Sequence, residues 1–402
     1  MICRLDCVTV EGGAATGSAV PAIVLGGGPS ALGVVRCLGR AGLRPYLVCP
    51  SGDFASRSRW ARGRVVQLDN HEDPDQLIAL RERLGFDRAV LIPCTDVWSQ
   101  AVASLPEAAR DHFATSTPTQ DTVELLIDKL LFAETLERFD VPRPRTLRVE
   151  TERDLDGPLD GFFLKPRHSQ LFAQRYRRKA LTFDGKQEAR DAFKLIADVG
   201  LTAVLQEFIP GPPIAHYFID GFIDRDGHVA ALFARRRIRM FPLEFGNSTL
   251  MVTVELKDVQ PAADSLVRLL SGIGYRGVFS AEFKYDKRDG LFKLLEVNSR
   301  PWWYIEFASL CGVDVSMLAY RDALGLELPT LDHYAVGERC VFLRQDIRAF
   351  WVLRRTDGLS LFAWLRSWVG ARPMIFAWSD PLPALFYLLI VFLRLWPRWR
   401  TP

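Results

Sequence analysis

The chain has 402 residues, more than one ordinary hydrophobic core organises, so two or three lobes are expected. Its apolar content of 49% and charged content of 25% are those of an ordinary folded protein, and a net charge of +3 does not suggest a nucleic-acid binder. The seven cysteines are scattered and never form C-x-x-C, which favours reduced thiols in the cytoplasm. The first 20 residues lack an unbroken apolar run, so a cleaved signal peptide is not expected.

After a loose tail over residues 1–20, a strand–helix–strand pattern predicts a doubly wound, Rossmann-like α/β lobe over residues 21–115. A short apolar strand covers 22–25, a helix pattern follows, and a second strand covers 45–49. A further strand is expected at 89–93, followed by a helix.

A glycine-rich segment, GGGPSALG at 26–33, joins the first strand to its helix. Backbone N–H groups at such a helix N-terminus bind anions well. The spacing does not match G-x-G-x-x-G, because Gly33 comes two residues late, and Val48-Cys49-Pro50 offers no acid to a ribose. A tight strand–helix turn is therefore favoured, with a substrate-side anion site or a dinucleotide site as alternatives.

Residues 116–335 have an α+β pattern unlike that of the first lobe. Residues 121–139 predict one amphipathic helix capped by Asp121, and the prolines of VPRPRT then force an extended segment. From residue 162 onward the sequence is rich in strands, with helices expected near 186–199 and 260–273. The segments YRGVFSAEFKYD and GLFKLLEV predict a hairpin.

Two acids of this hairpin are expected to face each other. With a loop at 288–290, Glu282 falls opposite Glu296, and Asn298 and Arg300 continue the same face at steps of two. Two carboxylates 4 Å apart repel by about 4 kcal/mol at an effective dielectric near 20, so protonation or a divalent cation is needed. Carboxylate and amide oxygens suit Mg²⁺ shared with phosphates. The alternative is an ordinary exposed strand face.

Several motifs follow one another between residues 22 and 330. They read IDKLLFAETLERFDVPRPRT, FFLKP, RRKALTF, LQEFIPG, RRIRMFPLEFGNST, AEF and LLEVNSR. Together they resemble the ATP-grasp superfamily, and more closely the carboxylate–amine ligases related to D-aspartate ligase. The resemblance implies a Rossmann-like lobe followed by a two-subdomain ATP-grasp fold at 116–335.

The resemblance also implies roles for individual residues. ATP would be bound by Lys129, Lys165, Ser169, Lys179, Gln206, Glu207, Phe208 and Ile209. Phosphoryl or carboxylate groups would be held by Arg300, Arg237 and Arg239. Mg²⁺, or Mn²⁺ in its place, would be held by Glu282, Glu296 and Asn298.

Two departures from the family pattern stand out. The segment PRHSQLFAQRYRR between Lys165 and Lys179 contains no glycine, so side chains such as His168 and Ser169 are expected to contact phosphate instead of bare backbone. The acid that often holds the ribose in this family is hard to place, because prolines follow the LQEFIPG segment.

The resemblance implies a ligase that joins a small-molecule carboxylate to an amine through an acyl phosphate. The alternatives are an enzyme that forms carbamoyl or acyl phosphate without amide formation, and a catalytically degenerate nucleotide-binding scaffold. Trp302, Trp303 and Tyr304, which follow the hairpin, either line the acceptor site or pack in the core.

Residues 336–402 predict a helical extension rich in tryptophan and arginine. Its apolar run at 384–393 is too short to span a bilayer. Trp378, Trp396 and Trp399, with nearby arginines, favour contact of 375–402 with a membrane surface at the inner face of the cell membrane. The alternative is packing on the chain's own domain or on a second subunit of a homodimer.

Overall fold

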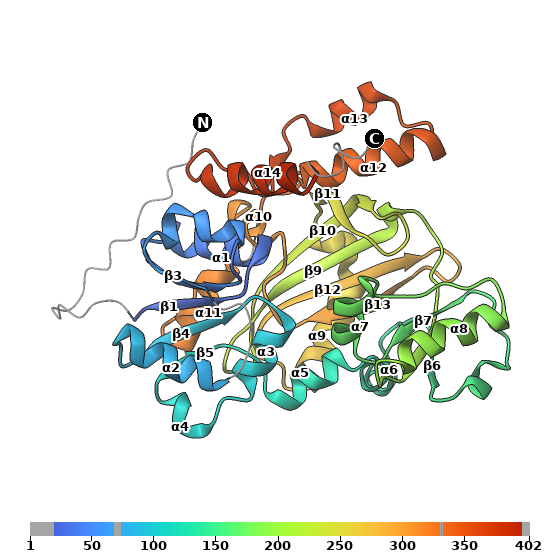
Figure 1. The fold of residues 1–402 in the computed structure, drawn as a ribbon, viewed down its shortest axis with the longest axis horizontal. Coiled ribbons are helices and arrows are strands. Elements are labelled where there is room, and N and C mark those ends of the chain that lie inside the picture. Colours follow the sequence, from blue (N-terminus) through green and yellow to red (C-terminus); the bar gives the residue numbers. More distant parts are fainter. Residues whose placement is uncertain (1–19, 68–73, 330, 332, 396–402) are drawn as a thin grey trace.

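The computed structural model describes residues 20–67, 74–329, 331 and 333–395. Within this part, the strands form sheets of five, three and seven strands. In Figure 1 the five-stranded sheet lies at the left, the seven-stranded sheet fills the centre, and the small sheet lies at the lower right. The tail predicted at 1–20 lies almost entirely outside the described residues.

The N-terminal lobe is the predicted doubly wound parallel sheet. Its strand order is β3 (Val65–Gln67), β2 (Tyr46–Cys49), β1 (Ala22–Leu25), β4 (Ala89–Pro93) and β5 (Phe113–Thr115). Its helices are α1 (Gly28–Arg40), α2 (Pro74–Leu84), α3 (Asp96–Ala103) and α4 (Glu107–Arg110). Alternate residues of β1 point to separate cores, so both sheet faces are covered and the strand is apolar throughout.

The helix predicted over 121–139 is wrong, because the chain forms two helices there. These are α5 (Gln120–Ile127) and α6 (Lys129–Arg138), and they are separated by Asp128 in an extended conformation. Thr119, not Asp121, caps α5. The Asp128 carboxylate accepts hydrogen bonds from the backbone N–H groups of Leu130 and Leu131, and thereby caps the second helix.

The small antiparallel sheet has the order β6 (Thr146–Val149), β8 (Ala203–Glu207), β7 (Phe162–Pro166). Helices α7 (Ser169–Tyr176) and α8 (Lys186–Ala197) belong to the same part of the chain (Figure 1). The glycine-free segment after Lys165, which the sequence predicts as a phosphate-covering loop, is thus largely the helix α7.

The central sheet is built around the predicted hairpin. Its order is β13 (Leu291–Asn298), β12 (Gly277–Asp286), β9 (His216–Ile223), β10 (Val229–Phe241), β11 (Asn247–Thr253), β14 (Arg339–Val341) and β15 (Arg372–Pro373). Helix α9 (Gln260–Gly272) packs on one side of this sheet. Helices α10 (Ile305–Leu310) and α11 (Val315–Ala323) lie in the other core, which the sheet shares with the N-terminal lobe.

The C-terminal region is helical as predicted, with α12 (Leu343–Thr356), α13 (Leu361–Trp368) and α14 (Leu382–Leu395) along one end of the molecule (Figure 1). A buried network fixes this region, because the Arg36 guanidinium of α1 contacts Glu306 at 2.9 Å and Asp380 at 3.0 Å. Trp302 and Tyr304 are buried in the shared core, which is the packing alternative given for them above.

Candidate nucleotide and metal site

Two adjoining cavities of about 260 and 140 Å³ lie between the small sheet and the hairpin. Lys165, Lys179, Gln206 and Glu296 line both of them. The first is also lined by Lys129, Ser169, Asn298 and Arg300, and the second by Glu207, Phe208, Ile209, Arg237 and Glu282. The structure thus brings every predicted site residue except Arg239 to one cleft.

The two hairpin acids lie opposite each other, as predicted: Glu282 pairs with Glu296 in the antiparallel register. His216 and Arg237 both contact Oε1 of Glu282, at 2.8 and 2.9 Å. Burial opposes ionisation of Glu282, but Arg237 and the hydrogen bond from His216 outweigh it and lower its pKa. The sequence predicts that protonation or a divalent cation relieves the repulsion between the two carboxylates, whereas in the structure Arg237 offsets the charge of Glu282.

Beyond Glu296, the polar row continues along β13 as predicted. The Asn298 amide donates to Glu296 at 3.2 Å, and its oxygen accepts from Arg300 at 3.3 Å. Arg300 also reaches across to Asp96 of the N-terminal lobe, with contacts of 2.6 and 3.2 Å to its two carboxylate oxygens. This ion pair fixes the guanidinium and joins the lobe to the hairpin.

Three lysines from separate segments line the same cavity as this row, namely Lys129, Lys165 and Lys179. Lys129 is the first residue of α6, so the break at Asp128 directs it to the cleft, where it donates to Ser169 at 2.5 Å. Burial lowers the pKa of Lys129 to about 8, and the neighbouring charge of Lys165 contributes. Burial also lowers the pKa of Lys165, whose Nζ donates to Gln206 at 2.8 Å. Such a concentration of positive charge suits phosphate groups.

The second cavity has an aromatic wall. The ring centroids of Phe163 and Phe245 lie 4.8 Å apart, and Phe208 meets both edge-on. The Nζ of Lys284 lies over the Phe208 ring, 5.0 Å from its centre. Planar walls of this kind suit a nucleobase. The Glu207 side chain points elsewhere, to Arg288 at 2.6 Å.

Arg239 does not reach the cleft. A bulge in β10 falls between Arg237 and Arg239 and breaks the alternation that would have placed both on one face. Arg239 instead forms a buried two-point contact with Asp346 of α12, at 2.9 and 2.7 Å. The assignment of this residue to a phosphate or substrate carboxylate is therefore corrected to a structural role.

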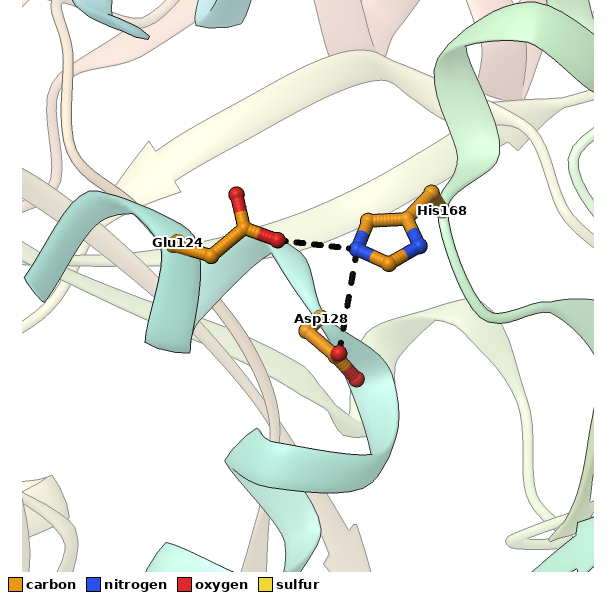
Figure 2. A group of neighbouring side chains, drawn as sticks. All are labelled: Glu124, Asp128 and His168. Atoms are coloured by element: carbon orange, nitrogen blue, oxygen red, sulfur yellow. Dashed lines mark hydrogen bonds and ion pairs between the residues drawn. The ribbon is translucent and has the colours of Figure 1, made fainter. Parts of the chain in front are cut away.

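His168 is also used differently from the prediction. Figure 2 shows its ring pointing to Glu124 and Asp128, at the junction of α5 and α6, with Nε2 at 3.0 and 3.7 Å. Arg167 contacts the same Asp128 oxygen at 2.7 Å and neutralises it. The cluster therefore holds the helix junction against the start of α7 and leaves little negative charge for a metal ion.

In the glycine-rich turn, a side chain of the protein occupies the position where an anion would bind. The Asp53 carboxylate accepts the Gly28 N–H at 2.9 Å, and a side chain on Gly27 would collide with it. A dinucleotide phosphate or a substrate anion would have to displace Asp53, which supports the tight-turn interpretation.

The sequence does not predict Phe163 and Phe245 of the aromatic wall as site residues, nor Asp96, His216 and Lys284. Asp96 comes just after the parallel strand β4, and α/β sheets bind ligands at the carboxyl ends of their strands. Its position in the sequence could therefore have indicated a site residue. His216 and Lys284 act through cross-strand neighbours: β12 pairs with β9, and Lys284 lies opposite His216. Nothing in the linear sequence marks that pairing.

The fold is similar to the folds of several solved structures. The N5-carboxyaminoimidazole synthetase of Staphylococcus aureus superposes with a TM-score of 0.63 at 13% identity, covering 84% of this chain and 86% of that one. The L-amino acid ligase of Bacillus licheniformis gives 0.57 at 17% identity, with coverages of 77% and 75%. A biotin carboxylase domain from Hydrogenobacter thermophilus, solved with MgADP and bicarbonate, gives 0.60 at 16%, with coverages of 79% and 73%.

These likenesses establish the fold, which the chain shares with the three solved structures. No family model matches the sequence. In sequence the chain is similar to the D-aspartate ligase of Enterococcus faecium strain Aus0004, with 25% identity over 253 residues. That match spans 58% of this chain and 58% of the length of the relative.

Proposed function

We propose that the chain is an ATP-dependent carboxylate–amine ligase that forms an amide through an acyl phosphate. The observation that carries the proposal is the cleft that Lys129, Lys165 and Lys179 line together with Glu296, Asn298 and Arg300. The similarity to a D-aspartate ligase supports this reaction class. The substrates of this chain would be a small carboxylate and an amine, with aspartate as the first to test.

The arrangement suggests how each part would contribute. The aromatic wall would hold the base, and the three lysines would hold the phosphates. Ser169 begins α7, so backbone N–H groups at a helix start would replace the glycine-rich loop that this chain lacks. Arg300, fixed by Asp96, would contact the transferred phosphoryl group.

The oxygen donors Glu282, Glu296 and Asn298 fit Mg²⁺, with Mn²⁺ as the alternative. Both side-chain contacts to Glu282 described above fall on Oε1, which leaves Oε2 for a cation. The metal would offset negative charge on the phosphates during transfer. The solved neighbour with MgADP supports this use of the fold.

The reaction would run in two balanced steps. A carboxylate oxygen bonds to the γ-phosphorus while the bond to ADP breaks. The amine nitrogen then bonds to the acyl carbon, phosphate leaves with the carboxylate oxygen, and the nitrogen loses a proton. The enzyme's part in both steps is positioning and charge neutralisation.

The test is ADP release from Mg·ATP with pooled carboxylates and amines. Glu296→Ala should abolish release without changing the circular dichroism, whereas Glu134→Ala, an exposed acid of α6, should leave release unchanged. Retained turnover in Glu296→Ala would sink the metal assignment. Release that needs only the carboxylate would indicate acyl- or carbamoyl-phosphate formation without amide ligation.

A degenerate scaffold is the second candidate, because Glu282 is already paired with Arg237 and His216. A scaffold should bind ATP and release no ADP with any substrate pool. The domain limits, a cytoplasmic location, a homodimer and membrane contact through 375–402 stay predictions. No described helix is both long enough and apolar enough to cross a membrane.

A further inference from the structure

Helices α12, α13 and α14 form one end of the molecule (Figure 1). Exposed apolar side chains are concentrated on these helices and on the segments between them. Of the 23 large apolar side chains exposed in the described part of the chain, 14 lie between residues 343 and 393. We call these the C-terminal face. They are Leu343, Ile347, Trp351, Leu361, Phe362, Leu365, Val369, Trp378, Leu382, Leu385, Leu388, Leu389, Phe392 and Leu393.

Helical spacing gathers these side chains into stripes. On α12 they recur every four residues, at Leu343, Ile347 and Trp351, and therefore lie on one side of the helix. Asp346 and Ala349, which lie on other sides of α12, are buried, and Phe350 is buried beside the stripe, stacked on Trp364 of α13. Because the buried sides face the body of the protein, the apolar stripes point away from it.

The same division holds for the other two helices. On α13, Leu361, Phe362 and Leu365 are exposed while Trp364 is buried. On α14 the exposed leucines recur at three- and four-residue steps, while Ala384 is buried in the shared core. A patch that spans three helices is larger than the scattered apolar residues of an ordinary surface.

The charges around this face are mostly positive. Five arginines are exposed there, namely Arg348, Arg354, Arg355, Arg366 and Arg372. Two of the four acids between 336 and 393 are removed from the surface, because Asp346 and Asp380 are buried against Arg239 and Arg36. The remaining two are Glu338, which contacts Arg372 at 3.4 Å, and the exposed Asp357.

We propose that the C-terminal face binds the surface of an anionic lipid bilayer, with its helices lying in the plane of the headgroups. Exposed leucine, phenylalanine and tryptophan would enter the interface while arginines contact lipid phosphates. Helix α14 has 14 residues and is about 21 Å long, shorter than a hydrocarbon core of about 30 Å, so it would lie along the surface. The surface includes α12 and α13, well beyond the segment 375–402 that the sequence indicates.

Cationic charge favours lipid over a second copy of this chain as the occupant. In a symmetric dimer the same patch faces itself, and five exposed arginines on each copy would repel across the contact. Anionic headgroups instead complement them, and each arginine near such a surface adds to binding.

The test is flotation of the full chain, without nucleotide or substrate, with vesicles of phosphatidylcholine alone or with roughly a third phosphatidylglycerol. Binding is expected to the anionic vesicles and to weaken as salt is added. The variant Phe362→Ser/Leu385→Ser should lose binding. The matched control Leu195→Ser/Leu326→Ser, which changes exposed apolar residues elsewhere, should keep it.

A charge variant, Arg348→Gln/Arg354→Gln/Arg355→Gln, should weaken binding to anionic vesicles at least about tenfold. Equal binding to both vesicle types, or full binding by the Phe362→Ser/Leu385→Ser variant, would overturn the proposal. So would a lipid-free dimer in analytical ultracentrifugation that this variant dissociates. Because no ATP is present, these outcomes are independent of the ligase assay.

Discussion

Replacing Asp346 by asparagine is expected to lower the free energy of unfolding by about 3–5 kcal/mol, because it leaves the buried Arg239 without a counter-charge. The Asp346 carboxylate has no exposed surface. It accepts two hydrogen bonds from Arg239, one from Thr249 at 2.6 Å, and one from each indole N–H of Trp364 and Trp368 at 2.9 and 2.7 Å. Asparagine keeps the size of the side chain but loses the charge.

Urea unfolding followed by tryptophan fluorescence measures this loss. Asp357→Asn, at the exposed end of α12, is the matched control and should change the unfolding free energy by less than about 0.5 kcal/mol. The double variant Arg239→Met/Asp346→Asn should cost less than the sum of the single changes, since neither charge is then left unpaired. If Arg239→Met were as stable as the parent but released no ADP, Arg239 would act in the cleft and the structural assignment would be refuted.

The pH dependence has a definite sign. Burial opposes ionisation of Asp346, but Arg239 outweighs it and lowers its pKa below the ordinary value of 3.8. A carboxyl with a lowered folded pKa contributes stability above its unfolded pKa, and this contribution is lost as pH falls through the folded pKa. The difference between the parent and Asp346→Asn should therefore be full at neutral pH and shrink in acid below about pH 4.

Three further predictions concern the cleft and the N-terminal lobe. Because the pKa of Lys129 is about 8 and a phosphate would raise it, ATP binding should take up protons near pH 9 and weaken as pH rises above 8, measured by calorimetry in buffers of different ionisation enthalpy. Flat affinity from pH 7 to 10 would contradict this. Asp96→Asn should lower the maximal rate about tenfold or more by freeing Arg300, with thermal unfolding as the control. Gly27→Ala should displace Asp53 and cost about 1–3 kcal/mol in denaturant unfolding; an unchanged midpoint would refute the clash.

The sequence predicted the structure best where the periodicity of apolar and polar residues within one strand decides which side chains share a face. The two-residue repeat of β13 predicts Glu296 and Asn298 on one face, and Glu282 does lie opposite Glu296. A register shift between Glu282 and Phe283 separates this pairing from the register next to the loop, where Asp286 lies opposite Leu291. Periodicity gave a wrong prediction at Asp128, because the helical pattern of apolar residues continues through this position. In the structure Asp128 caps α6 and pairs with Arg167, and the helix is interrupted there. Periodicity failed again at Arg239, where a bulge adds a residue and shifts the side chain toward Asp346.

Tertiary partners account for most of what the sequence could not reveal. Arg237 and His216 reach Glu282 from two other strands, and Asp96 reaches Arg300 from another lobe. The segment after Lys165 contains no glycine, and that is compatible with helix α7 as well as with a loop. Composition alone could not separate these two outcomes.

In the proposed mechanism, a substrate carboxylate attacks the γ-phosphate of ATP in this cleft. The direct measurement uses a carboxylate substrate that supports ADP release, labelled with ¹⁸O in its carboxylate, and follows the label by ³¹P NMR of the phosphate formed. An acyl-phosphate route predicts one ¹⁸O atom in each inorganic phosphate, with amide formed in equal amount. Amide formation with unlabelled phosphate would contradict the account.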